Sequence, residues 1–228
     1  ATIAGLTFGM VATTKYPLGK DEPFIYNHNT SQFLTLQSVV GSYLPVTQAY
    51  TGPWTPPTIA SVGVYVIVTH PGFDGVTNMF GWFDMTTPAT PKWQAGNTTT
   101  NAIGGIPVAV ANFNNRAYFA FNNTLAYTDV LTLNRAAASQ AVTLGDSANV
   151  LALSGLPIQT TSSGVIGALI AFKAFQTWQI TGDPATSNLT ENYISLTIGT
   201  SSPRSIAQSP LGIYFASISG PMIIDLLG

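Results

Sequence analysis

Residues 165–184 read Val-Ile-Gly-Ala-Leu-Ile-Ala-Phe-Lys-Ala-Phe-Gln-Thr-Trp-Gln-Ile-Thr-Gly-Asp-Pro, and this stretch decides the fold class. An apolar run, Ile166 to Phe172, is followed by a tight turn and then by a second run, Thr177 to Ile180. The runs are rich in β-branched and aromatic residues, and Gly and Asp follow the second one. Short runs of this kind, separated by turn residues, are typical of antiparallel strands.

The same order recurs immediately downstream. Ile206 and the run Leu211 to Phe215 precede a second run, Met222 to Ile224, which ends at Asp225. The chain from Val165 to Asp225 therefore consists of two similar units laid end to end. Repeated short strands with regularly spaced turns predict an all-β fold, a β-propeller-like array of short antiparallel sheets.

These segments also carry a resemblance. ALIAFKAFQTWQITGDPATSN (168–188), IGTSSPRSIAQ (198–208) and GIYFASISGPMIID (212–225) resemble the propeller region of tail-tube, nozzle and head-completion proteins of short-tailed (podovirus-like) phages. In that family a segment of the type F-K-x-x-x-x-W/Y-x-[IL]-T-G precedes a Pro-Arg-Ser segment and a G-[IV]-Y-F-x-S-x-x-G strand pair. ANFNNRAYFAFNNTLAYTDV (111–130) resembles another unit of the family. The resemblance covers residues 108–225 and implies a tail component around a DNA-ejection conduit.

Earlier segments also predict strands. Gly63 to His70 and Met79 to Asp84 predict a hairpin, because Asp74-Gly75 between them suits a tight connection. A three-strand meander is expected over Ile106 to Phe113, Arg116 to Phe121 and Leu125 to Thr128. Its turns fall at Asn114-Asn115 and Asn122-Asn123, since Asn tolerates left-handed backbone conformations.

We predict a single all-β domain over residues 1–228, built from five blade-like units. Their expected spans are 1–57, 58–105, 106–163, 164–201 and 202–228, with a loop or connector at 39–57 because of its Pro and Gly content. Residues 136–144 are compatible with a short helix. Strands at Val142 to Leu144 and at Val150 to Leu153 are expected equally. A complete ring needs about four to eight four-stranded blades. The irregular period therefore favours an incomplete or distorted propeller, and the chain is expected to be part of a longer polypeptide.

Charge is scarce in this sequence. Only 7% of the residues are charged, against about 25% in typical globular proteins, and the net charge is −2. Such a surface has little charge to keep molecules apart, which favours a subunit of a larger assembly. The seven basic residues are scattered, whereas nucleic-acid binding concentrates Lys and Arg. DNA near this protein is expected to pass without specific binding.

The sequence contains no constellation that predicts catalysis. Cysteine is absent, and His28 and His70 have no acidic neighbours at metal-ligand spacing. No Gly-x-Ser-x-Gly elbow or phosphate-binding loop occurs. Nearly all of the acidic residues lie close to Gly, Pro, Thr or Asn, which is typical of turns. We therefore expect no enzyme, no cofactor, no metal and no membrane-spanning segment. Most aromatic residues fall inside expected strands, which favours packing between sheets over sugar stacking.

Arg204, in Ser202-Pro-Arg-Ser, is the candidate site residue. A planar guanidinium can bond several carbonyls, so Arg204 is either an inter-blade or inter-subunit anchor or an exposed turn residue.

Three functional hypotheses remain. The first, which the resemblance implies, is a structural virion protein, located in the phage tail, that forms a ring with itself and contacts other tail, adaptor or portal proteins. The second is a carbohydrate- or receptor-binding module. The third is a propeller glycosidase, which needs two acids in one cleft.

Overall fold

The computed structural model describes the chain in segments. These are residues 6–9, 24–27, 32–36, 43–46, 57–71, 79–84, 93–95, 103–133, 140–161 and 164–225. Side chains are described for residues 57–71, 79–84, 103–133, 140–155 and 167–225.

The described strands form five antiparallel sheets, and each sheet is a meander of strands consecutive in sequence. The first sheet contains β1 (Leu6–Gly9), β2 (Phe24–Asn27), β3 (Gln32–Leu36) and β4 (Tyr43–Val46). The second contains β5 (Thr58–Val62), β6 (Tyr65–Thr69), β7 (Gly81–Asp84) and β8 (Trp93–Ala95). The third contains β9 (Ala109–Phe113), β10 (Arg116–Phe121), β11 (Thr124–Tyr127) and β12 (Ala141–Thr143).

Residues 165–184 lie in the fourth sheet and in connections within it, and the similar downstream unit forms the fifth sheet. The fourth sheet contains β13 (Ala152–Thr161), β14 (Gly164–Phe172), β15 (Thr177–Thr181) and β16 (Thr190–Ser195). The fifth contains β17 (Ala207–Ser209), β18 (Gly212–Ser217) and β19 (Gly220–Asp225). Two short 3-10 helices, η1 (Pro184–Thr186) and η2 (Pro203–Ser205), lie in connections. The prediction of an all-β, propeller-like array of short antiparallel sheets is confirmed.

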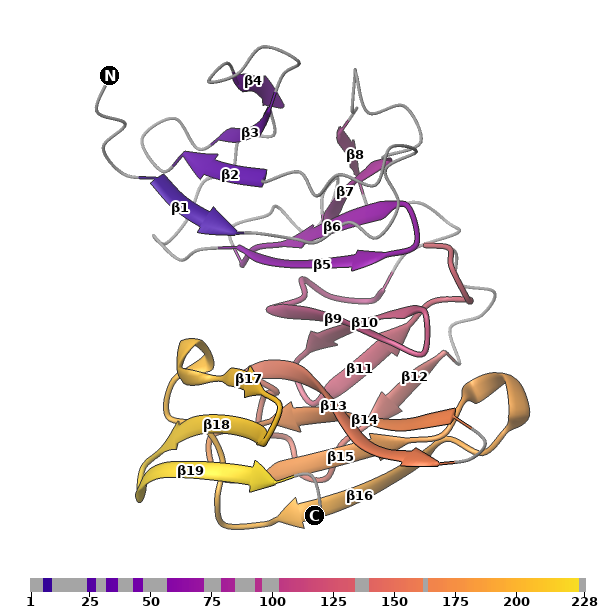
Figure 1. Cartoon of the computed structure of the whole chain (residues 1–228), viewed down its shortest axis with the longest axis vertical. Coiled ribbons are helices and arrows are strands. Elements are labelled where there is room, and N and C mark those ends of the chain that lie inside the picture. Colours follow the sequence, from indigo (N-terminus) through magenta and orange to yellow (C-terminus); the bar gives the residue numbers. More distant parts are fainter. Residues whose placement is uncertain are drawn as a thin grey trace.

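The sheets are stacked along the long axis of the molecule rather than closed into a barrel (Figure 1). The first strands of successive sheets lie against one another: β5 contacts β9, β9 contacts β13, and β13 contacts β17. This is the arrangement of innermost strands in a propeller, here opened into a stack. The first sheet lies at one end, and the fourth and fifth sheets lie at the other (Figure 1).

The inner strands of the middle sheets are buried on both faces. On β10, Ala117 and Phe119 pack with the second sheet, whereas Tyr118 and Ala120 pack with the fourth. On β14, alternate residues pack against the third sheet and, through Phe172, against Phe215 of the fifth sheet. Successive side chains on a strand point to opposite faces. A strand covered on both sides therefore reads as a continuous apolar run, as these two strands do.

The tight connections follow the expected chemistry. Asn114, Asn115 and Asn122 adopt positive φ angles of 50°, 57° and 49° in the turns of the β9–β10–β11 meander. Asn tolerates this left-handed conformation better than most residues. The predicted meander is thereby confirmed, and so is the pairing of the two strands of the predicted hairpin, β6 and β7.

One expected unit boundary differs from the boundaries of the sheets. β13 pairs with β14 from Ala152↔Phe172 to Thr161↔Gly164, so the unit boundary expected at Gly164 falls between two paired strands. The expected loop 39–57 contains a strand, β4, at the edge of its sheet, which is where Pro is tolerated because an edge residue needs no ladder N–H. Of the two alternatives for 136–144, a strand is present as β12. Residues 134–139, Asp74-Gly75 and His28 lie outside the described residues.

Candidate functional site

An open groove of about 590 Å³ runs across the first strands of the sheets. It begins at Ser61 on β5, crosses Asn112 on β9 and Ser154 on β13, and reaches Gln208 on β17. The remaining lining residues are Ile59, Ala60, Val110, Ala111, Phe113, Asn114, Leu153, Gly155, Gly167 and Ala168. The groove therefore occupies the position of the central channel in a closed propeller.

The groove carries no charged side chain among its lining residues. Its polar groups are hydroxyls and carboxamides, and two of them tie sheets together. Asn112 Nδ2 donates to the carbonyl of Ser61 at 2.7 Å, and Asn114 Nδ2 donates to the carbonyl of Gly182 at 2.8 Å. Carboxamides neither transfer protons near neutral pH nor attract phosphate by charge. The groove can hold water or a neutral polar ligand, but its described lining residues include no general acid, no base and no nucleophile with an adjacent base.

Arg116 links the third sheet to the fourth. Its side chain is 5% exposed, and Nη2 lies 3.2 Å from Asp183 Oδ1, in the segment between β15 and η1. Nη1 donates to the carbonyl of Thr128 at 2.8 Å. The neighbouring phenol of Tyr118 is fully buried, and its hydroxyl has no hydrogen-bond partner. Burial raises the pKa of Tyr118 well above its usual range, against the opposing charge of Arg116.

Lys173 ties the connection between β14 and β15 to the loop that follows β12. Its side chain is completely buried, and Nζ donates to the carbonyl of Leu144 at 2.6 Å. It also donates at 2.8 Å to both the carbonyl and the Oδ1 atom of Asp146. The three ammonium protons thus meet three acceptors, which is the condition for burying this charge. The hydrogen bond from Lys173 lowers the pKa of Asp146, assisted by the bond from the Ala148 amide.

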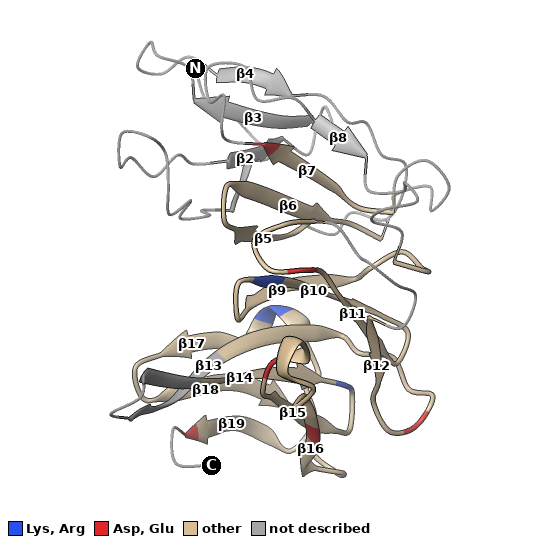
Figure 2. Cartoon of the chain, turned by 90° about the vertical axis from the view of Figure 1, so that its right-hand side faces the viewer, with Lys and Arg blue, Asp and Glu red and all other residues tan. Residues whose placement is uncertain are grey.

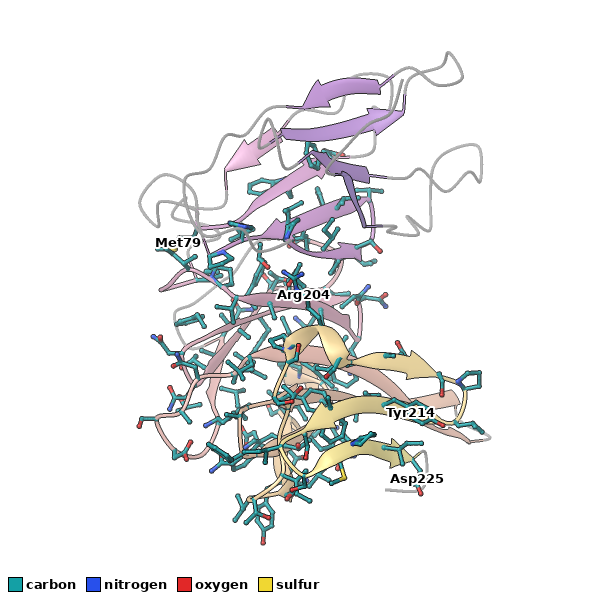
Figure 3. The ribbon with its side chains drawn as sticks, turned by 90° about the vertical axis from the view of Figure 1, so that its left-hand side faces the viewer. Met79, Arg204, Tyr214 and Asp225 are labelled. Atoms are coloured by element: carbon teal, nitrogen blue, oxygen red, sulfur yellow. The ribbon has the colours of Figure 1, made fainter. Side chains whose placement is uncertain are left out.

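Arg204, the predicted anchor, lies in η2 and is exposed (Figure 3). Its guanidinium makes no hydrogen bond or ion pair with the residues whose side chains are described. The cations that join sheets in the described structure are Arg116 and Lys173. Sequence reasoning passed over both as scattered charges. The available signal was that each is a lone cation within an apolar β-rich run, a setting where Lys and Arg are seldom left unpaired.

The described acids do not converge on a catalytic or metal centre. Figure 2 shows Asp and Glu on separate elements, and none of them lines the groove. Over the described ranges, no group of three His, Asp or Glu residues is arranged to hold a metal ion. His70 is buried beside β6 and takes part in interactions of the protein interior.

The fifth sheet has one buried and one open face. Ile213, Phe215 and Ile224 pack against the fourth sheet. On the opposite face, Tyr214 and Ile223 are cross-strand partners that remain 42% and 46% exposed. Figure 3 shows Tyr214 on β18 and Asp225 at the end of β19. We call the outward residues Ala207, Tyr214, Ala216, Pro221 and Ile223 the open face; β-pairing joins Ala207 to Tyr214 and Ala216 to Pro221.

No family model and no curated protein matches this chain. Among the described residues, none belongs to a helix with the length and apolar character needed to cross a membrane. Two features thus remain as candidates for function, the uncharged groove and the open face.

Proposed function

We propose that this chain is a structural, non-enzymatic subunit of a larger assembly, namely an oligomeric ring in the tail of a tailed phage. The observation that carries the proposal is the open face of the fifth sheet. Contiguous exposed apolar residues on a sheet mark surfaces that become covered by a partner. The resemblance of residues 108–225 to short-tailed phage tail proteins supplies the identity of the assembly.

The electrostatics support the same role. A tail conduit has to let DNA slide rather than hold it, and binding to DNA depends on Lys and Arg that neutralise phosphates. The groove has no basic lining residue, and the exposed Arg204 is an isolated charge. In the proposed ring, neighbouring subunits contact head to tail and the assembly closes by rotation. Other tail, adaptor or portal proteins are the proposed neighbours.

Electron microscopy of the native assembly that contains this chain tests the proposal. Negative-stain images are expected to show rotationally symmetric rings with a central hole, either isolated or at the end of a capsid. An antibody against this chain, used with gold labelling, should mark those rings. If the antibody finds the chain as a free particle of its own size, absent from any virion or ring, the proposal is wrong.

The groove favours a second candidate function, recognition of a carbohydrate or receptor. Carboxamides and hydroxyls suit the hydroxyl groups of an uncharged glycan, and Gln208 and Ser154 make no side-chain hydrogen bond with the described residues. A glycan microarray tests this function with wild type, with Gln208→Ala and with Arg204→Ala, which lies outside the groove lining, as the control. Binding that Gln208→Ala removes and the control retains would support it. An array without signal would exclude it for the glycans displayed.

A further inference from the structure

We infer that the open face of the fifth sheet binds a second copy of this chain, through the sheet at the other end of that copy's stack. This inference rests on the proposed function and adds to it the interface and its orientation. It begins from the way successive sheets cover one another within the chain.

The stack repeats one kind of interface. A cluster of Val62, Ile67, Phe80 and Phe119 joins the second and third sheets, and further apolar clusters join the third to the fourth and the fourth to the fifth. In every case, apolar side chains of one sheet face those of the next. The open face therefore continues a series of established interfaces, at the position where a further sheet would pack.

The sequence of β18 fits this position. Ile213, Tyr214, Phe215 and Ala216 form an unbroken apolar run, like those of β10 and β14. Strands with one face in water alternate apolar with polar residues, whereas strands covered on both faces do not. β10 and β14 are covered on both faces, but the outward side of β18 carries the 42% exposed Tyr214. β18 thus has the sequence of a strand covered on both faces, whereas its outward side is exposed at Tyr214.

The covering element is expected to be an uncharged sheet. The open face carries one charge, Asp225, which follows Ile223 by two residues on β19 and so lies on the same side, at the end of the face. The rest of the face is uncharged and neither attracts nor orients a charged partner. Tyr214 and Ile223 are each still more than 40% exposed, and removing the rest of their apolar surface from water favours an apolar partner. Polar or charged ligands would gain little from such a surface.

A second copy has two stack ends, its own open face and its first sheet. In the second, third and fourth sheets, the inner strands β6, β10 and β14 are buried on both faces. The first sheet, β1–β4, lies at the opposite end of the stack (Figure 1). Its strands carry no charged residue in LTFG, FIYN, QFLTL or YLPV. Contact between opposite ends is heterologous, and such contacts build rings or open filaments.

The first test is self-association of the purified chain, measured by analytical ultracentrifugation over a range of concentrations. Wild type is expected to form concentration-dependent oligomers. Tyr214→Glu should weaken association by at least about 30-fold, which is the effect of losing one interface hot spot. The matched control is Tyr193→Glu on β16, because Tyr193 is 63% exposed and lies on another sheet. Circular dichroism and melting temperature establish that both variants fold.

Cross-linking identifies the docked sheet. The chain has no cysteine, so Ile223→Cys provides a unique site for a maleimide-benzophenone photo-cross-linker. Mixing isotope-labelled with unlabelled chains separates contacts between copies from contacts within one copy. Cross-links between copies are expected in residues 6–46. Cross-links to residues 207–225 of the other copy would indicate a symmetric pairing of two open faces and would overturn the inference.

The remaining outcomes also decide the matter. If wild type stays monomeric, or if Tyr214→Glu and Tyr193→Glu associate as wild type does, the open face does not bind a second copy. Neither result bears on whether the chain is a tail subunit, because electron microscopy of the native assembly decides that separately. Rings in the particle together with a monomeric purified chain would assign the open face to a different tail protein.

Discussion

Replacing Lys173 by Met tests whether buried cations hold the stack together. Met keeps an unbranched apolar chain of similar length, so the substitution removes the charge and its three hydrogen bonds with little change in packing. The connection between β14 and β15 would then lose its attachment to the loop after β12. We expect the variant to fold and to be less stable than wild type.

The size of the stability loss depends on which hydrogen-bond donors remain for each of the three acceptors once Lys173 is replaced. The Asp146 carboxylate, whose side chain is 55% exposed, is rehydrated by water. The Asp146 carbonyl keeps the donor Asn123 Nδ2 at 3.0 Å. The carbonyl of the fully buried Leu144 has neither water nor a second side-chain donor among the described residues to replace Lys173. A buried acceptor left without a partner costs about 1–3 kcal/mol. Removing the ammonium also removes the cost of burying its charge, which offsets part of this penalty. We therefore expect the free energy of unfolding to fall by about 2 kcal/mol.

Urea denaturation followed by tryptophan fluorescence measures this loss, since Trp178 hydrogen-bonds to Gln176 in the same network. For a chain of this size, about 2 kcal/mol corresponds to a melting temperature about 4–8 °C lower. Arg204→Met is the control, because it removes a cation from an exposed position and should change stability by less than about 0.5 kcal/mol. A change of the same small size in Lys173→Met would refute the reasoning.

Three further predictions concern acid sensitivity, backbone contact and core packing. The lowered pKa of Asp146 contributes stability that is present above the ordinary Asp value of about 3.9 and is lost as pH falls through the folded-state pKa. Asp146→Asn should therefore flatten the dependence of unfolding free energy on pH between about 5 and 2, and an unchanged slope would contradict the role given to Lys173. Gly199→Ala places a Cβ 2.1 Å from the Lys173 carbonyl and should cost about 1–3 kcal/mol, whereas Gly155→Ala, whose nearest atom is at 3.9 Å, should be close to neutral by the same urea titration. Phe119→Ala empties a fully buried position in the core between the second and third sheets and should cost about 3–5 kcal/mol; a thermal melt within 2 °C of wild type would show that the core is not packed as described.

The sequence was sufficient to predict the strands and the tight turns. The apolar runs that indicated strands became β14 (Gly164–Phe172) and β15 (Thr177–Thr181), and the Asn pairs that indicated turns adopt left-handed conformations at Asn114 and Asn122. These outcomes depend on β propensity and turn chemistry, which neighbouring residues carry.

The partition into sheets was harder to predict. β13 includes Gly155 and Pro157, with a register irregularity between Pro157 and Gln159, so its sequence lacks the regular alternation of a strand. Its assignment to the fourth sheet rests on hydrogen bonds to β14, and the pattern of β13 alone gives no sign of that partner.

The sequence by itself determined the all-β class, the short strands, their turns and the scarcity of charge, because periodicity and composition express these properties locally. Only the tertiary structure decided which cations anchor the stack and which face stays open. Arg116 meets Asp183 across 67 residues of sequence, and Lys173 meets Asp146 across 27. Likewise, β18 has an apolar run like that of β14, and only the packing of the sheets leaves Tyr214 uncovered. Ion pairing and burial depend on distances in space, and the folded arrangement of the sheets sets these distances.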